Sequence, residues 1–162
     1  MDIQILIGLL LTILPISELR IGLPVIIEYC VRNGISIWPY FLLVLILNIF
    51  IIFLIFIFFD FVHELFMKFR WYRNVIGHML KRLQKKVSKV RSKMDKWGYL
   101  ALMFFVAIPL PGSGAWTGAL IAWIIGLDRL KSFVAITFGV IVAGLIIFLV
   151  SLGSLGFFNG FY

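Results

Sequence analysis

The chain has 162 residues, 63% of them hydrophobic, and a mean hydropathy of +1.13. Soluble domains are only about half apolar, so this composition excludes an ordinary soluble protein and predicts an integral membrane protein. The net charge is +8, but 11 of the 15 Lys and Arg residues lie between Lys68 and Lys96. One segment is therefore basic rather than the whole chain, which argues against a nucleic-acid-binding protein.

The apolar runs of the chain are of two lengths. A helix that crosses the hydrocarbon core needs about 20 residues. Two runs exceed that length and are predicted as full transmembrane helices, over residues 35–66 and 132–158. The other runs are about half as long and form two pairs, within 3–31 and 97–127, each pair joined by a turn rich in Pro and Gly. The sequence predicts a helical hairpin for each pair.

Each hairpin has two alternative paths, either one interrupted crossing or a re-entrant loop that returns to its own side. If the hairpins crossed, the basic segments at 68–96 and 128–131 would lie on opposite faces, against the tendency of Lys and Arg to stay cytoplasmic. Re-entrant hairpins place both basic segments in the cytoplasm, so we expect re-entrant hairpins with both termini outside.

The two halves of the chain then have the same plan. Residues 1–66 and 97–162 each contain one hairpin followed by one full transmembrane helix, and the hairpins enter from opposite sides. The predicted fold is an all-α membrane protein built as an inverted-topology repeat, with broken helices that meet near the midplane.

The segment 67–96 between the halves is predicted to be a cytoplasmic basic amphipathic helix, because apolar residues recur every three or four positions among Lys and Arg. We expect it to lie on the anionic leaflet as a connector. A dimerising coiled coil is the alternative. The residues expected to contact lipid headgroups are Lys81, Arg82, Lys85, Lys86 and Lys89.

The strongest site signal is the pair Glu18 and Arg20 in the first hairpin turn. A charge at bilayer depth costs at least about 2.5 kcal/mol on insertion scales, so its default meaning is functional. We expect an extended turn in which both side chains line a cavity, where Glu18 binds a proton or cation and Arg20 binds an anionic group. The alternative is a salt bridge that only holds the turn together.

The second hairpin turn, 109–118, is expected to face the first. Its glycines allow the backbone to approach a ligand, and the helix that opens near Ala115 would direct its N-terminal dipole into the same cavity. The alternative is that Gly and Pro only permit a tight turn and close packing. The candidate binding residues of this turn are Pro109, Pro111, Gly112, Ser113, Gly114 and Thr117.

Other polar residues give weaker signals. Asp60, His63 and Glu64 fall near the cytoplasmic end of the first transmembrane helix and are expected at the interface. The single cysteine and the two histidines have no metal-ligand spacing. There is no pairing of nucleophile and base and no cofactor-binding loop, so we expect neither an enzyme nor a cofactor.

The two turns, with the sequences "PISELRIGLP" and "FFVAIPLPGSGAWTGALIA", resemble those of a bacterial and archaeal family called putative small multi-drug export proteins. That family is in turn similar to the DedA/VTT membrane proteins, which have paired re-entrant loops and are implicated in moving polyprenyl phosphates and phospholipids. The resemblance implies a protein of a bacterial or archaeal cell membrane. DedA loops carry acidic residues and arginines, matched here by Glu18 and Arg20, whereas Gly112, Ser113 and Gly114 stand where a second-loop arginine is expected.

The expected function is a small secondary transporter of the small multidrug export type, with proton coupling through Glu18. Its partners would be membrane lipids, protons and either an amphipathic small molecule or a lipid-linked phosphate, and a homodimer would help to cover the hairpins. The alternatives are a flippase or scramblase of polyprenyl phosphate or phospholipid and, from another class, a membrane scaffold that binds anionic lipid or a partner protein. A scaffold would not need a carboxylate at bilayer depth.

Overall fold

The computed structural model describes residues 2–15, 17–68, 97–110 and 112–159, with only the backbone given for residue 67 and for 156–159. These residues contain helices and no strand, as the sequence predicts. The helices are α1 (Ile3–Ile13), α2 (Glu18–Arg32), α3 (Trp38–Met67), a helix over Trp97–Ala107, α5 (Ala115–Ile125) and α6 (Arg129–Asn159). The predicted amphipathic helix and its headgroup contacts, from Lys81 to Lys89, lie outside the described residues.

Two helices are long and apolar enough to cross a membrane, namely α3 and α6. They contain 30 and 31 residues, and at 1.5 Å per residue each is about 45 Å long, more than the hydrocarbon core requires. The expectation of two long apolar helices is thus confirmed. Pro39 lies in the first turn of α3, where its missing N–H is tolerated.

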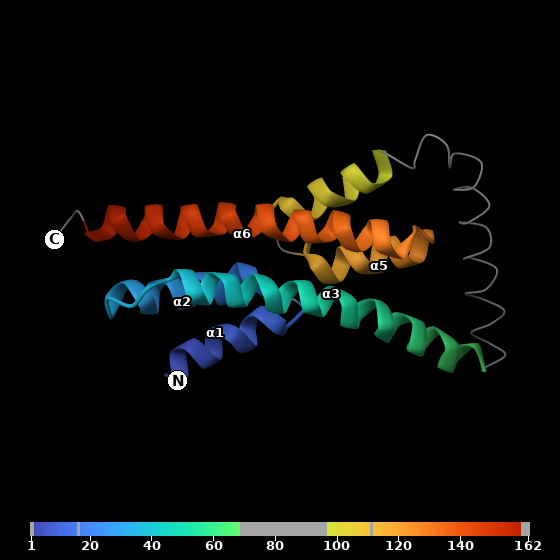
Figure 1. The fold of residues 1–162 in the computed structure, drawn as a ribbon, viewed down its shortest axis with the longest axis horizontal. Helices are drawn as coiled ribbons and strands as arrows, with labels where there is room; N and C mark the ends of the chain where they lie inside the picture. The colour runs from blue at the N-terminus through green and yellow to red at the C-terminus, as the bar shows by residue number, and fades with distance from the viewer. Residues whose placement is uncertain (1, 16, 69–96, 111, 160–162) are drawn as a thin grey trace.

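Shorter helices form one hairpin in each half of the chain. Figure 1 shows α1 and α2 approaching the middle of the bundle from the end where α3 begins. The helix Trp97–Ala107 and α5 approach the middle from the opposite end, where α6 begins. The loops of the two hairpins consequently face each other halfway along the molecule.

The first hairpin turn is shorter than the sequence predicts. The Pro- and Gly-rich stretch suggests irregular backbone as far as Pro24, but α2 already begins at Glu18 and continues through Pro24. Proline inside a helix removes one backbone hydrogen bond, here the one that the carbonyl of Arg20 would accept. The expected extended conformation of Glu18 and Arg20 is therefore wrong, since both residues lie in the first turn of a helix.

Close backbone packing holds α1 against α2. A Cβ added at Gly22 would overlap the carbonyl oxygen of Gly8 and the backbone of Thr12. The absence of side chains at these two glycines lets the helices approach at short range, as is common between membrane helices. Buried aliphatic residues of α2, α3 and α6 continue this packing, among them Ile26, Val44 and Ile136.

The outer face of the bundle is as apolar as its centre. Large hydrophobic side chains stand exposed along both long helices, for example Phe50, Phe138 and Leu149 at 55%, 56% and 67%. Water-soluble proteins rarely expose apolar surface on this scale. Together with the two long apolar helices, this surface indicates a membrane protein.

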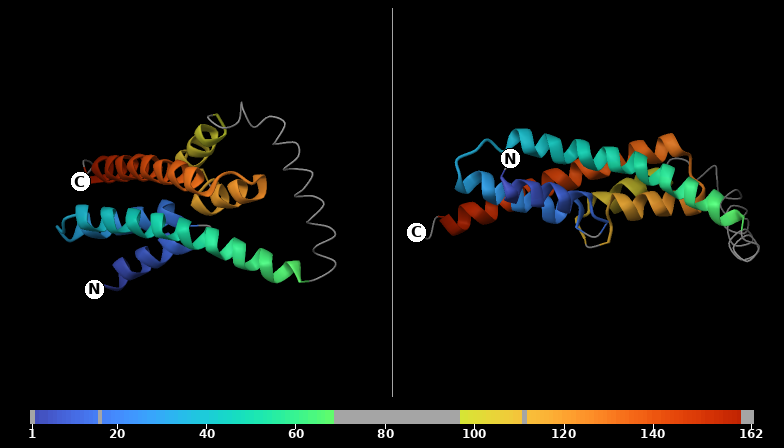
Figure 2. Two further views of the ribbon diagram at one scale, coloured as in Figure 1. Left: turned by 45° about the vertical axis from the view of Figure 1, so that its right-hand side comes forward. Right: turned by 90° about the horizontal axis from the view of Figure 1, so that it is seen from below.

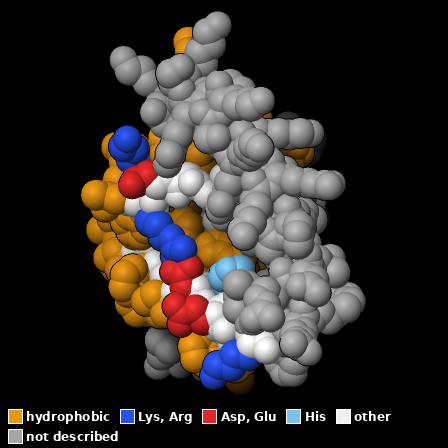
Figure 3. Space-filling view, turned by 90° about the vertical axis from the view of Figure 1, so that its right-hand side faces the viewer, with side chains coloured by type: hydrophobic (Ala, Val, Ile, Leu, Met, Phe, Trp, Pro, Cys, Tyr) orange, Lys and Arg blue, Asp and Glu red, His pale blue; other side chains and the backbone are white. Residues whose placement is uncertain are grey.

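A group of polar contacts lies at the end of the bundle where α3 ends and α6 begins. Arg129 of α6 forms a two-pronged ion pair with Asp60 of α3, and the indole of Trp123 on α5 donates to Asp60 at 3.1 Å. Figure 3 views the molecule from this end and shows acidic and basic side chains side by side. Asp60 therefore joins three helices, beyond the interfacial position expected from the sequence.

Candidate functional site where the hairpin loops meet

The two hairpin loops lie side by side near the middle of the molecule (Figure 2, right). One loop joins α1 to α2 and the other joins the helix Trp97–Ala107 to α5. Direct hydrogen bonds connect them, although the bonded residues are 88 to 98 positions apart in the sequence. This loop contact is the candidate functional site.

Glu18, the first residue of α2, extends from the end of the first loop to the N-terminus of α5. One carboxylate oxygen accepts a hydrogen bond from the backbone N–H of Ala115 at 3.2 Å, and the other accepts one from Trp116 at 3.1 Å. The residue is only 4% exposed. A buried carboxylate thus lies at the positive end of the α5 dipole, where a negative charge is stabilised.

The N-terminus of α5 needs this distant carboxylate because its own cap residue has no side chain. The first N–H groups of a helix have no partner within the helix, and Ser, Thr, Asp or Asn at the cap normally supplies one. Gly114 occupies the cap of α5 and cannot do so. A side chain there would also overlap the Glu18 carboxylate, since a Cβ built on Gly114 meets its atoms.

The backbone of Glu18 is itself unusual. Its φ is 45°, in the left-handed region that residues other than glycine seldom adopt. Such a conformation costs about 1–3 kcal/mol and persists where the surroundings impose it. Here the sharp turn between α1 and α2 directs the side chain at α5, so the strain accompanies the contact between the loops.

Arg20 makes a second link between the loops. Its Nη2 donates to the hydroxyl of Ser113 at 3.0 Å and lies 3.4 Å from the carbonyl oxygen of Ile108. Ser113 is 6% exposed, and its hydroxyl lies 2.7 Å from that same carbonyl oxygen. The guanidinium therefore donates hydrogen bonds to the second loop instead of projecting into an open cavity.

Glu18 and Arg20 do not form an ion pair with each other. The ion pairs among the described residues are Glu28–Arg32 and Asp60–Arg129. Glu18 is instead bonded to the start of α5, and Arg20 is bonded to the second loop. The pair thus joins the two halves of the chain and is not a salt bridge confined to one turn.

The remaining predicted residues of the second loop lie around this contact. Gly112 is exposed, has a φ of 82° and would meet nothing within 4 Å if it carried a Cβ. Pro109 is partly buried in the loop, and Thr117 is partly buried in the first turn of α5. None of these three residues bonds Glu18 or Arg20. Pro111 lies outside the described residues.

The sequence predicts that the N-terminus of α5 points into this site, but not that its backbone N–H groups bind Glu18. The partners of Glu18 are two N–H groups, and one partner of Arg20 is a carbonyl. A glycine at a helix start was the available signal, because it leaves N–H groups that require an outside acceptor. The binding of Asp60 to Arg129 was missed as well.

One protein family, described as putative small multi-drug export protein, matches residues 18–146. The chain belongs to this family. The matched region begins at Glu18 and includes Arg20, Ser113 and Gly114, so every residue that joins the two loops through its side chain falls within it. The chain matches no curated protein and no solved structure.

Proposed function

We propose that this member of the small multi-drug export family is a proton-coupled secondary transporter, not an enzyme, and that the contact between Glu18 and α5 is its coupling element. The observation that carries the proposal is a single buried carboxylate bonded across the interface between the two halves of the chain. A group in this position can link its own protonation to the relative movement of the halves.

Protonation would weaken the contact for two reasons. A carboxylate accepts hydrogen bonds at both oxygens, whereas a carboxylic acid carries a donor at one of them. The charge that the α5 dipole attracts also disappears. The ionised form of Glu18 would then hold the loops together, and the protonated form would let them separate, as alternating access requires.

The substrate that fits best is an amphipathic cation. Glu18 is the only buried charged side chain among the described residues, and its carboxylate would be free for a cation once it left the N-terminus of α5. A cation and a proton would compete for the same carboxylate, so that binding of one releases the other. This competition is sufficient to couple export of the cation to entry of protons.

A lipid-linked phosphate is the second candidate, and one observation favours it. If Glu18 left α5, the N–H groups of Ala115 and Trp116 would become free for a phosphate, with Arg20 bonded to the adjacent part of the loop. The protein would then act as a flippase or scramblase, and protonation of Glu18 would open the anion site. Transport assays with the two substrate classes distinguish these candidates.

We further propose that each hairpin enters the membrane and returns to its own side, and that the two halves form an inverted repeat. Support comes from Figure 1, where both ends of the α1–α2 hairpin lie at the end where α6 terminates, and both ends of the second hairpin lie at the opposite end. By the tendency of Lys and Arg to stay inside, the basic segment 68–96 would make that opposite end cytoplasmic, and both termini would then lie outside.

Reporter fusions in cells test this topology. A reporter fused after Tyr162 should be active outside, and one inserted at Ser88 should be active in the cytoplasm. A Ser36→Cys variant on a Cys30→Ala background should react with an impermeant thiol reagent from outside, because Ser36 is exposed between α2 and α3 whereas Cys30 is fully buried. If Tyr162 and Ser88 report the same side, the hairpins cross the membrane and the inverted repeat is wrong.

Transport itself is tested with purified protein in liposomes that carry a pH gradient. We expect a fluorescent lipophilic cation to accumulate on the acidic side, and accumulation to stop when an ionophore removes the gradient. A fluorescent polyprenyl phosphate, assayed in parallel, should show no change of leaflet beyond that in protein-free liposomes. Movement of the phosphate alone would select the flippase, and movement of neither probe would leave the scaffold as the function.

A further inference from the structure

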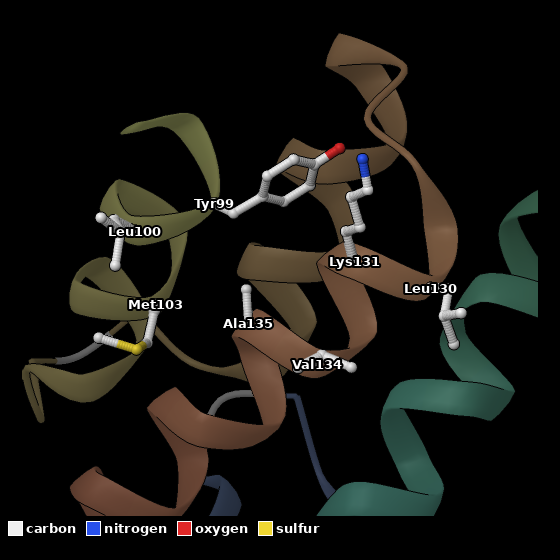
Figure 4. A pocket seen from close by; sticks show the side chains of 7 residues that line it. All are labelled: Tyr99, Leu100, Met103, Leu130, Lys131, Val134 and Ala135. Carbon is white, nitrogen blue, oxygen red and sulfur yellow. The ribbon is translucent and has the colours of Figure 1, made fainter. Parts of the chain in front are cut away.

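A groove lies between the helix Trp97–Ala107 and α6, away from the loop contact. Its volume is about 420 Å³, within the range of about 300–1,000 Å³ that is usual for small-molecule sites. The floor is apolar, and the residues that form it are Leu100, Met103, Val134 and Ala135. Figure 4 shows Leu100 and Met103 on one helix beside Val134 and Ala135 on α6.

Two polar groups lie together at one end of the groove. Lys131 Nζ is 5.9 Å from the centre of the Tyr99 ring, and Figure 4 shows the ammonium and the hydroxyl on the same side. The Tyr99 hydroxyl accepts a hydrogen bond from the N–H of Asp128 at 3.1 Å, which leaves its own proton to donate. Lys131 forms no ion pair with any described residue.

Asp128, the acid nearest to Lys131 in the sequence, forms no ion pair with it. The Oδ1 atom of Asp128 accepts a hydrogen bond from the backbone N–H of Lys131 at 3.0 Å, so it caps the start of α6. Arg129, the other cation of this turn, is paired with Asp60. The groove therefore combines an apolar floor with one ammonium that is unpaired among the described residues and one spare hydroxyl donor.

We propose that this groove binds one anionic phospholipid, with an acyl chain on the apolar floor and the phosphate held by Lys131 and Tyr99. The two parts of the groove lie at the depths that the two parts of a lipid require. The polar pair lies in the first turns of the two helices, and the apolar floor lies further along them. Trp97, 74% exposed at the start of its helix, marks the level at which aromatic residues meet lipid headgroups.

Native mass spectrometry of the protein, extracted from nanodiscs with equal amounts of phosphatidylglycerol and phosphatidylcholine, tests the proposal. We expect one retained phosphatidylglycerol per chain. Lys131→Gln should reduce its retention about fivefold, the usual contribution of one lysine near an anionic surface. Lys131→Arg should restore it, and Lys68→Gln, which removes an exposed charge at the end of α3, should leave it unchanged.

A second pair of variants tests whether the acyl chain binds on the apolar floor. Val134→Trp fills the groove and should lower retention, whereas Val142→Trp, at another exposed position of α6, should not. Equal retention of phosphatidylcholine, or full retention by Lys131→Gln, would overturn the proposal. A dimer that Val134→Trp dissociates would show that a second copy occupies the groove instead. Because the readout is bound lipid, the result does not depend on whether the protein transports anything.

Discussion

Replacing Glu18 by glutamine should abolish the response of transport to a pH gradient. Glutamine keeps the size of glutamate and one carbonyl acceptor for the N–H groups of Ala115 and Trp116, but it cannot take up or release a proton. In liposomes, accumulation of the cationic probe should fall to the level of protein-free vesicles. Any remaining downhill movement should be independent of pH.

The variant should also be less stable, because the bonds at α5 lose their charge. Hydrogen bonds to charged groups contribute about 1.5–3 kcal/mol, roughly twice the value of neutral ones, so we expect a loss of about 1–2 kcal/mol in detergent. Glu28→Gln is the matched control, because it makes the same change in the same helix at an exposed pair with Arg32. That control should retain both stability and the pH response.

Arg20→Gln separates coupling from the strength of the loop contact. It removes the bonds to Ser113 and Ile108 but leaves the carboxylate in place, so transport should weaken while its pH response persists. If the Glu18→Gln variant still follows the pH gradient, the carboxylate does not couple transport. If both variants behave alike, the two charges serve only to hold the loops together.

The pairing of the two loops was predictable from the sequence, whereas its atomic form was not. A charge in an apolar run must find a partner inside the protein, so Glu18 and Arg20 pointed to the glycine-rich turn across the midplane. Which group binds which depends on the φ of 45° at Glu18 and on residues 97 positions away. No local pattern encodes either feature.

The lengths of the long helices followed from hydropathy, but details at helix ends required tertiary contacts. Pro24 reads as a turn signal, yet packing of Gly22 against Gly8 in α1 favours a helix through it. The position of Asp60 near a helix end predicts an interfacial residue. Its pairing could not be predicted, because its partner Arg129 is 69 positions later in the chain. In both cases a long-range contact outweighed the local preference.

The glycine at the cap of α5 offers a direct test of the loop contact. Gly114→Ala should expel the Glu18 carboxylate, because the new methyl group occupies the space of its oxygen atoms. We expect a loss of about 2–3 kcal/mol, which combines overpacking with the loss of charge-assisted hydrogen bonds, and a loss of pH-driven transport. Gly153→Ala, in an open helical position, should be neutral or slightly stabilising.

A double-mutant cycle shows whether this effect acts through Glu18. In a Glu18→Ala background the carboxylate is absent, so adding Gly114→Ala should cost less than about 1 kcal/mol. Gly112→Ala is the comparison within the same loop: it meets no neighbour but must hold a left-handed backbone, which costs about 1–2 kcal/mol in either background. Unfolding in detergent measures all of these variants. An equal cost of Gly114→Ala in both backgrounds would mean that this glycine serves the turn alone, and that the cap of α5 by Glu18 does not govern the contact between the two halves.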